Sequence, residues 1–132
     1  MNRSLESIGV ITLFVADPQR SKAFYEDVFG VPAIFEDGNS AVVKFENLLV
    51  NLLEAGEAPT LITPAAVGAS GSRFLLTIWV DDVDAVCAQL AERGVELLNG
   101  PLDREWGVRT AAFVDPDGHA WEVAQQLGGA AA

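Results

Sequence analysis

The chain has 132 residues, of which 50% are hydrophobic and 20% are charged, a balance that suits one compact domain with an apolar core and argues against disorder. Its formal net charge of −11 repels nucleic acid and anionic membrane, so neither is an expected partner, and it favours cationic small molecules. No apolar run is long enough to cross a bilayer. Cys87 is the only cysteine, so no internal disulfide can form and a reducing cytoplasm is the expected setting.

The first part of the chain has the pattern of a strand, a helix and three further strands. Alternating apolar residues predict the first strand over about 8–15. Asp17-Pro18 is a typical helix start, with an acidic N-cap and proline at the first helical position, and Gly30 is a typical stop. Three short strands are then expected at about 32–37, 40–46 and 48–54.

The same pattern then begins again, which makes an internal repeat the most informative feature of the sequence. Asp82 follows Asp17 by 65 positions and Gly94 follows Gly30 by 64, so the second helix is expected to be one residue shorter. Cys87 falls on the apolar stripe of this helix, where a buried structural thiol is expected. The later strands are expected near 95–99, 107–114 and 119–125, the last two joined by the turn "DPDG".

These elements predict an α+β fold in which two tandem βαβββ units form a curved mixed sheet around a cavity. The whole chain, 1–132, is expected to be a single domain. Unit one spans about 8–54, residues 55–73 are expected to be a linker, and unit two spans about 74–126. The last residues, "LGGAAA", are expected to form a loose tail.

The order of elements, with "VADPQRSKAFYEDVFG" after the first strand and "FVDPDGHAWEV" near the end, resembles the vicinal oxygen chelate superfamily. That group includes glyoxalase I, extradiol dioxygenases, fosfomycin-modifying enzymes and bleomycin resistance proteins, and the resemblance covers about 8 to 126. It implies two sheets that curl into a cup-shaped cavity, commonly in a homodimer.

The resemblance also implies where a metal would be held. In metal-using members, equivalent positions of each unit supply ligands, one on the first strand and one on the last. Here these positions carry Val10 and Leu75, which cannot bind a metal, and Asn51 and Glu122, which together make a poor transition-metal site. His119 would point to the opposite face of the sheet from Glu122, and it follows a turn glycine, where exposure is usual, so a turn or surface histidine is expected. No metal and no other cofactor are therefore expected.

Glu122 has two readings that the sequence leaves open. An inward carboxylate in an apolar pocket suits an acid–base role or a cationic ligand. Alternatively, it pairs with a cavity-edge arginine, Arg109, and stabilises the strand.

The inward face of the cup is expected to be apolar with a few polar groups, as in many small-molecule sites. Trp79 and Trp106 are the candidates for stacking on a flat ligand. The "WG" at Trp106 resembles that of bleomycin-binding proteins, in which the tryptophan contacts ligand; packing against the linker or a dimer partner is the alternative. Lys44 and Arg109 are candidates for counter-charge. The full set of expected ligand-binding residues is Thr12, Phe14, Asn51, Thr77, Trp79, Trp106, Arg109 and Glu122, with Glu122 also the candidate catalytic residue.

Three functions are consistent with these residues. The first is a metal-independent binding protein that holds a hydrophobic, aromatic or cationic ligand, an antibiotic among the candidates. The second is a glyoxalase-like lyase or isomerase, or a dioxygenase, that uses Glu122 as acid–base or metal ligand. The third is an interaction module whose dimer surface is the function. The sequence favours the first.

Overall fold

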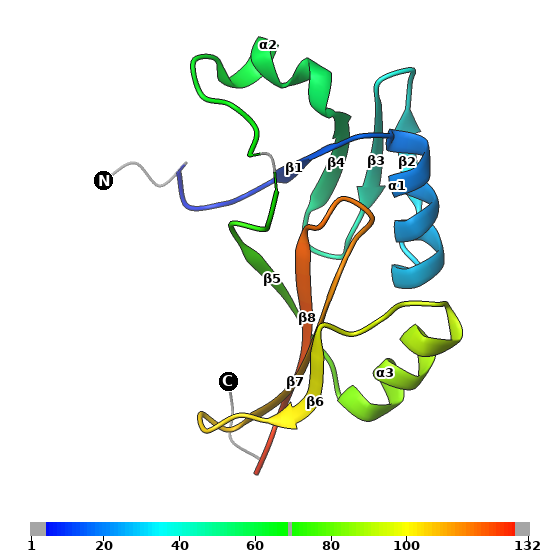
Figure 1. Ribbon diagram of the computed structural model, residues 1–132, viewed down its shortest axis with the longest axis vertical. Helices are drawn as coiled ribbons and strands as arrows, with labels where there is room; N and C mark the ends of the chain where they lie inside the picture. Colours follow the sequence, from blue (N-terminus) through cyan, green and yellow to red (C-terminus); the bar gives the residue numbers. More distant parts are fainter. Residues whose placement is uncertain (1–4, 69, 129–132) are drawn as a thin grey trace. The chain divides into compact units, whose positions relative to one another are not determined.

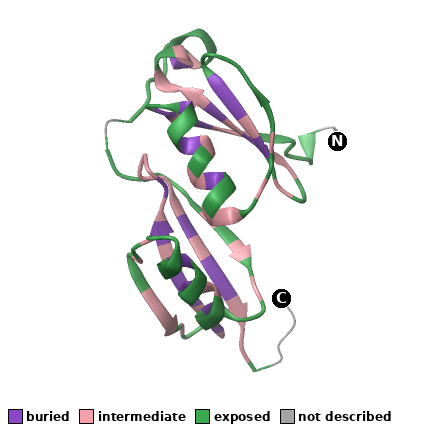
Figure 2. Ribbon diagram, turned by 90° about the vertical axis from the view of Figure 1, so that its right-hand side faces the viewer, coloured by how far each residue is buried: buried purple, intermediate pink, exposed green. Residues whose placement is uncertain are grey.

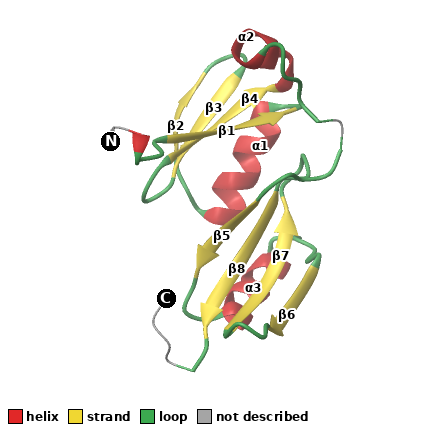
Figure 3. Ribbon diagram, turned by 90° about the vertical axis from the view of Figure 1, so that its left-hand side faces the viewer, coloured by secondary structure: helices red, strands yellow, loops and turns green. Residues whose placement is uncertain are grey.

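The computed structural model describes residues 5–68 and 70–128, and it divides into two compact units with the boundary between residues 69 and 70. Figure 1 shows the elements of both. Each unit is a four-stranded mixed sheet with a helix on one face (Figure 3), so the α+β prediction is confirmed, and each unit is described by itself. The predicted tail falls partly on residues 129–132, which lie outside the described residues. None of the described helices is long and apolar enough to span a membrane.

Unit one contains one sheet with the strand order β1-β4-β3-β2. β1 runs parallel to β4, and the other neighbours are antiparallel. The elements in chain order are β1 Val10–Val15, α1 Pro18–Phe24, the π-helix η2 Tyr25–Phe29, β2 Ala33–Glu36, β3 Ser40–Lys44, β4 Leu49–Glu54, the 3-10 helix η3 Ala55–Glu57 and α2 Ala58–Ile62.

The helix of unit one begins and ends where the sequence predicts. The Asp17 carboxylate accepts hydrogen bonds from the backbone N–H groups of Gln19 and Arg20, and Gly30 adopts the left-handed conformation with φ 72°. Between its acidic cap and its glycine stop, the helix of unit one has one residue more than the helix of unit two, and its last turn, Tyr25–Phe29, is π-helical. The wider turn of a π-helix takes up such an extra residue without breaking the hydrogen-bonded backbone.

The core of unit one lies between α1 and the sheet. Tyr25 is fully buried and stacks on Phe29, with 5.1 Å between the ring centroids. Figure 2 shows the buried stretches of the strands beneath the helix. Alternate residues of β1, β3 and β4 supply the apolar face, and those with at most 1% exposure include Leu13, Val15, Ala41, Val43, Val50 and Leu52.

Unit two repeats the same topology with the order β5-β8-β7-β6, in which β5 runs parallel to β8 and the other pairs are antiparallel. Asp82 caps the helix by accepting a hydrogen bond from the backbone N–H of Ala85. The elements are β5 Leu75–Trp79, α3 Val83–Glu92, β6 Asn99–Asp103, β7 Val108–Val114 and β8 Ala120–Gln126.

The core of unit two lies between α3 and the sheet face formed by the odd-numbered residues of β7 and β8. Phe113 and Trp121 are 1% and 3% exposed. Cys87 lies in this core, and burial raises the pKa of its thiol. A raised pKa leaves the thiol protonated at neutral pH, so Cys87 is an inert structural residue.

Two element boundaries differ from the sequence prediction. The expected linker is helical over 55–62, because Pro59 stands in the first turn of α2, where it fits without losing a hydrogen bond. The strand expected near 95–99 instead occupies Asn99–Asp103. The N–H of Val95 donates to the carbonyl of Leu90, so the start of this segment belongs to the end of α3.

Candidate functional site

In each unit the helix covers one face of the sheet, and the residues of interest lie on the other face. In β5 the exposed residues alternate as Leu75, Thr77 and Trp79. In β8, Glu122 lies directly beside Thr77, and Ala124 lies beside Trp79. Directly paired residues point to the same side of a sheet, so these side chains share one surface, which we call the face opposite α3.

Glu122 is held on this face by a hydroxyl group. Thr77 Oγ1 donates a hydrogen bond of 2.8 Å to Glu122 Oε1. Unit one repeats the arrangement at the same strand pair, where Asn51 Nδ2 donates to Thr12 Oγ1 over 3.4 Å and the two residues lie side by side in register. The carboxylate of unit two therefore corresponds to a neutral amide in unit one.

The described residues do not fit a resident transition metal. The two first-strand positions are hydrocarbons, Val10 beside Leu49 and Leu75 beside Ala120. Across residues 5–68 and 70–128 no group of three or more His, Cys, Asp or Glu side chains could hold a metal ion. In unit two, Glu122 has a hydroxyl and hydrocarbons as neighbours, and in unit one Asn51 has the same, so neither unit by itself offers enough donors for zinc, nickel or iron.

His119 lies at the turn before β8, as the sequence predicts, but it is half-buried rather than on the surface. Its Nδ1 lies 2.8 Å from Oδ2 of the buried Asp115, and its ring stacks on Phe74 with 5.8 Å between centroids. The hydrogen bond to the Asp115 carboxylate raises the pKa of His119. The same carboxylate accepts the backbone N–H groups of Asp117 and His119, so the pair stabilises the turn.

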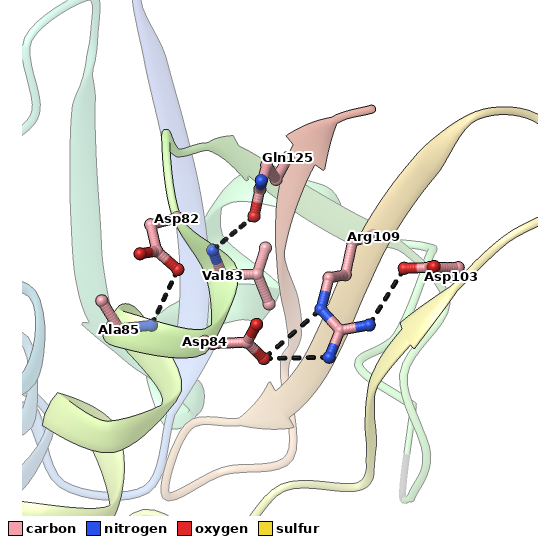
Figure 4. Close-up of polar contacts among 7 residues, drawn as sticks. All are labelled: Asp82, Val83, Asp84, Ala85, Asp103, Arg109 and Gln125. Carbon is pink, nitrogen blue, oxygen red and sulfur yellow. Dashed lines mark hydrogen bonds and ion pairs between the residues drawn. The ribbon is translucent and has the colours of Figure 1, made fainter. Parts of the chain in front are cut away.

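Of the two readings of Glu122, the pairing with Arg109 is wrong. Arg109 lies on the helix side of β7, where its Nη2 is 3.0 Å from Asp84 Oδ1 and its Nη1 is 2.9 Å from Asp103 Oδ1 (Figure 4). The hydrogen bonds to Asp84 and Asp103 raise the pKa of Arg109 still further above its high ordinary value. Arg109 therefore fastens α3 to the β6–β7 hairpin, and Glu122 lies on the other face.

The face opposite α3 has a different cation, Arg104, which the sequence analysis missed. Its Nε donates to Thr110 Oγ1 and its Nη2 donates to Asn99 Oδ1, each over 3.0 Å. Thr110 lies beside Ala124, and Ala124 lies beside Trp79. Arg104 therefore shares the face of Trp79 and Glu122.

Two tryptophans contribute to this region of unit two. Trp79 is 57% exposed and Trp106 is 72% exposed. Trp106 stands in the β6–β7 turn, and the Arg104 guanidinium carbon is 6.0 Å from its ring centroid. A cavity of about 320 Å³ adjoins Trp79 and is also lined by Val80, Asp81, Gln125 and Gln126.

Gln125 has a structural role at the edge of that cavity. Its Oε1 accepts the backbone N–H of Val83 over 2.8 Å, at the start of α3 (Figure 4). This contact places the odd-numbered residues of β8 on the helix side, together with the buried Trp121. Gln126, with the opposite parity, joins the face opposite α3.

The other expected residues belong to unit one. Thr12 and Phe14 lie in β1 beside Asn51 and Leu53 of β4, on the face opposite α1, and all four are half-buried. Lys44, at the end of β3, is exposed. The structure thus groups Thr77, Trp79 and Glu122 with Arg104 in unit two, and Thr12 and Phe14 with Asn51 in unit one.

This repeated architecture matches a known family. Residues 7–123 match the family model for the Glyoxalase/Bleomycin resistance protein/Dioxygenase superfamily. The chain belongs to this superfamily. The resemblance noted from the repeat and the "DPDG" turn is thereby confirmed.

Relatives within the glyoxalase/bleomycin resistance superfamily align over most of the chain. The uncharacterized protein YraH of Bacillus subtilis (strain 168) is 33% identical over 123 residues, which cover 89% of this chain and 96% of YraH. The metallothiol transferase FosB of Lysinibacillus sphaericus (strain C3-41) is 28% identical over 119 residues, covering 90% of this chain and 82% of FosB.

The solved structures agree on the fold. A glyoxalase/bleomycin resistance protein/dioxygenase from Nocardioides matches with a TM-score of 0.83 at 22% identity, over 94% of this chain and 85% of that one. At this identity the similarity shows a shared fold, so function has to be argued from the residues of this chain.

Proposed function

We propose that this protein is a metal-independent small-molecule binding protein of the glyoxalase/bleomycin resistance type, acting in the cytoplasm. Its ligand is hydrophobic, aromatic or cationic, and antibiotics of that chemistry are candidates. Glu122 is the charged anchor of the ligand, and Trp79 and Trp106 are the stacking surfaces.

The observation that carries this proposal is the grouping of Glu122, Thr77 and Trp79 on one sheet face. Thr77 fixes the Glu122 carboxylate at 2.8 Å, and an indole that is 57% exposed stands one register position farther along the same face. An aromatic plane beside an oriented carboxylate is suited to a flat cation, because stacking and charge attraction act on the same molecule.

The donor set supports binding without a metal. Hydrocarbons occupy the first-strand positions, Val10 and Leu75, at which metal-using relatives would need ligands. Glu122 is therefore left to interact with the ligand itself. The net charge of −11 adds a long-range preference for cations.

Calorimetric titration with a matched pair of compounds tests the anchor. N-methylquinolinium is a permanent planar cation, and 2-methylnaphthalene is its neutral counterpart. We expect the purified protein to bind the cation more tightly than the neutral compound. In Glu122→Gln the ratio of the two affinities should fall by about tenfold, as expected when a charge-assisted contact is lost. Glu92→Gln, an equal charge change on the exposed side of α3, is the matched control and should leave the preference unchanged.

The stacking surfaces are tested by a double variant. Trp79→Ala with Trp106→Ala should weaken both compounds by about tenfold, since each aromatic contact is worth about 0.5–1.5 kcal/mol. The buried Trp121 is left in place, so a circular dichroism signal from the intact core checks the fold. Full affinity in the double variant would show that these residues do not form the site.

Elemental analysis of the purified protein tests metal independence. We expect no stoichiometric transition metal, and dialysis against a chelator should leave ligand affinity unchanged. A tightly held ion that is lost in Glu122→Gln would contradict the proposal.

An enzyme of the glyoxalase or dioxygenase kind is the second candidate, and the relationship to FosB, whose name is metallothiol transferase, favours it. In that case Glu122, held by Thr77, acts as acid–base or metal ligand. Turnover of hemithioacetal or catechol substrates, with and without added divalent metal, tests this candidate. Activity that is abolished by Glu122→Gln but not by Glu92→Gln would favour the enzyme over the binding protein.

A homodimer is also part of the proposal. Exposed apolar side chains on both units, Phe35 and Leu75 among them, give a second copy of the chain an apolar surface to bury. Light scattering after size exclusion should give twice the monomer mass of 14.0 kDa.

A further inference from the structure

The two arginines of the β6–β7 hairpin differ in how their charge is balanced. Arg109, on the helix side, is bound by the two carboxylates of Asp84 and Asp103. Arg104, on the face opposite α3, is held by two neutral oxygen atoms, the hydroxyl of Thr110 and the amide carbonyl of Asn99. The charge of Arg109 is thus neutralised within unit two. The contacts of Arg104 fix its position, and no carboxylate of residues 5–68 and 70–128 balances its charge.

The contacts of Arg104 also leave one defined edge of the guanidinium group free. Thr110 and Asn99 engage Nε and Nη2, which form the side of the group. Nη1, at the end of the group, has no acceptor among residues 5–68 and 70–128, and Nη2, which carries two N–H groups, has Asn99 Oδ1 as its one acceptor there. Two parallel N–H donors at this end match the two oxygens of a carboxylate.

The support beneath Arg104 is rigid. Thr110 is only 2% exposed, in the middle of β7, and Leu102 and Ala124 flank it in the neighbouring strands. A guanidinium that is already ordered loses little side-chain entropy when it binds an anion, so more of the interaction energy appears as affinity. Arg104 itself is half-buried, so an anion that reaches it is partly shielded from water.

An aromatic surface adjoins this cation. The Trp106 ring is 72% exposed, and its centroid lies 6.0 Å from the Arg104 guanidinium carbon. A flat molecule on the indole would bring an attached acid group to the free end of Arg104.

We propose that Arg104 and Trp106 form an anion subsite that takes the carboxylate of a planar aromatic acid. This inference rests on the proposed binding function and deepens it: the ligand carries an acidic group at Arg104 and its aromatic or cationic part toward Trp79 and Glu122. The two ends of the ligand would lie over neighbouring positions of β7 on the same face. Ala112 lies beside Glu122, and Thr110, which holds Arg104, is two residues away along the strand.

Long-range attraction cannot produce such binding in this protein. The net charge of −11 repels anions from the surface as a whole. A preference for an anion over its neutral analogue therefore has to come from a local, positioned cation.

The test is calorimetric titration of the full chain with 2-naphthoate and with 2-naphthamide, which have the same shape and differ in charge. We expect 2-naphthoate to bind about tenfold more tightly, as one charge-assisted pair allows. Arg104→Gln should abolish this preference and leave 2-naphthamide binding unchanged, and Arg104→Lys should restore only part of it because lysine lacks the planar fork. Arg109→Gln, with the same change in charge on the other face of the hairpin, is the matched control and should keep the preference.

The two probes separate the inference from the proposed function. Binding of 2-naphthamide reports the aromatic site, and the ratio of the two affinities reports Arg104. Equal binding of both probes, or a preference that survives Arg104→Gln, overturns the anion subsite while the binding function stands. Absence of saturable binding of either probe at millimolar concentration overturns both.

Discussion

Thr77 and Glu122 form a hydrogen bond of 2.8 Å between two parallel strands, Oγ1 to Oε1, and this contact gives the carboxylate one orientation on the sheet. In Thr77→Val the carboxylate loses that partner at nearly constant side-chain volume. We expect N-methylquinolinium affinity to fall by about three- to tenfold, the value of a hydrogen bond to a charged group that is partly exposed. Thr77→Ser, which keeps the hydroxyl, should bind like the wild type. Unchanged affinity in Thr77→Val would mean that the orientation of Glu122 is irrelevant.

The sequence predicts the repeat, both helices and most strands because each depends on local chemistry. Asp17 and Asp82 cap helices in the structure as their positions before apolar stripes indicate. The strand misplaced at 95–99 begins instead where it pairs with β7, at Asn99 beside Ala112, and this pairing is non-local. No periodicity in the sequence reports it.

The candidate site was predicted in part. Thr77, Trp79 and Glu122 share a face because strand alternation applies without interruption in β5 and β8. Arg109 was assigned to the wrong face, although the "DPDG" turn contains the needed signal. The turn is closed by the hydrogen bond between Asp115 and His119, and this register pairs Ala112 with Glu122. Even-numbered residues of β7 therefore share the face of Glu122. Arg109 is odd-numbered and lies on the other face. Arg104 was missed because the irregularity in β6 between Asn99 and Leu102 obscures parity there.

Arg109 should be a structural residue of unit two. It joins Asp84 of α3 to Asp103 of β6 (Figure 4). Arg109→Met keeps the apolar stem and removes the charge, and we expect the Tm to fall by about 2–4 °C. The loss should shrink in about 1 M NaCl, because salt screens exposed ion pairs. Arg104→Met should lower the Tm less, since its partners are neutral. A larger loss in Arg104→Met would reverse the roles assigned to the two arginines.

His119 should make the stability of unit two depend on pH. Its hydrogen bond to the Asp115 carboxylate raises its pKa above the ordinary value of 6.5. A pKa that is higher in the folded state means that protonation stabilises the fold. This contribution is complete below about pH 6.5 and is lost as the pH rises through the folded-state pKa.

Direct titration measures the effect, because His119 is the only histidine in the sequence. Its ring protons should titrate by NMR with a midpoint above 6.5, and Asp115→Asn should lower that midpoint. In His119→Gln the stability that the wild type loses as the pH rises above about 6.5 should no longer be lost. A midpoint at or below 6.5 in the wild-type chain would contradict the pairing.

Gly100 should be indispensable to the strand that carries the Arg104 partner Asn99. Its φ of +89° is a conformation that side chains rarely adopt, and a Cβ there would overlap the Thr110 carbonyl oxygen and lie 2.8 Å from Ala111 Cα. Both atoms are backbone of β7, so neither can move aside without breaking the ladder. We expect Gly100→Ala to lower the free energy of unfolding by about 3 kcal/mol or more.

Gly118→Ala measures the cost of backbone strain alone, without the steric clash expected in Gly100→Ala. Gly118 has nearly the same φ, +90°, with no atom within 4 Å of the added Cβ, so only backbone strain of about 1–2 kcal/mol is expected. Urea denaturation of the two variants measures the difference. If they lose equal stability, the close approach of β6 to β7 at Gly100 is absent in solution, and the position given to Asn99 beside Arg104 loses its support.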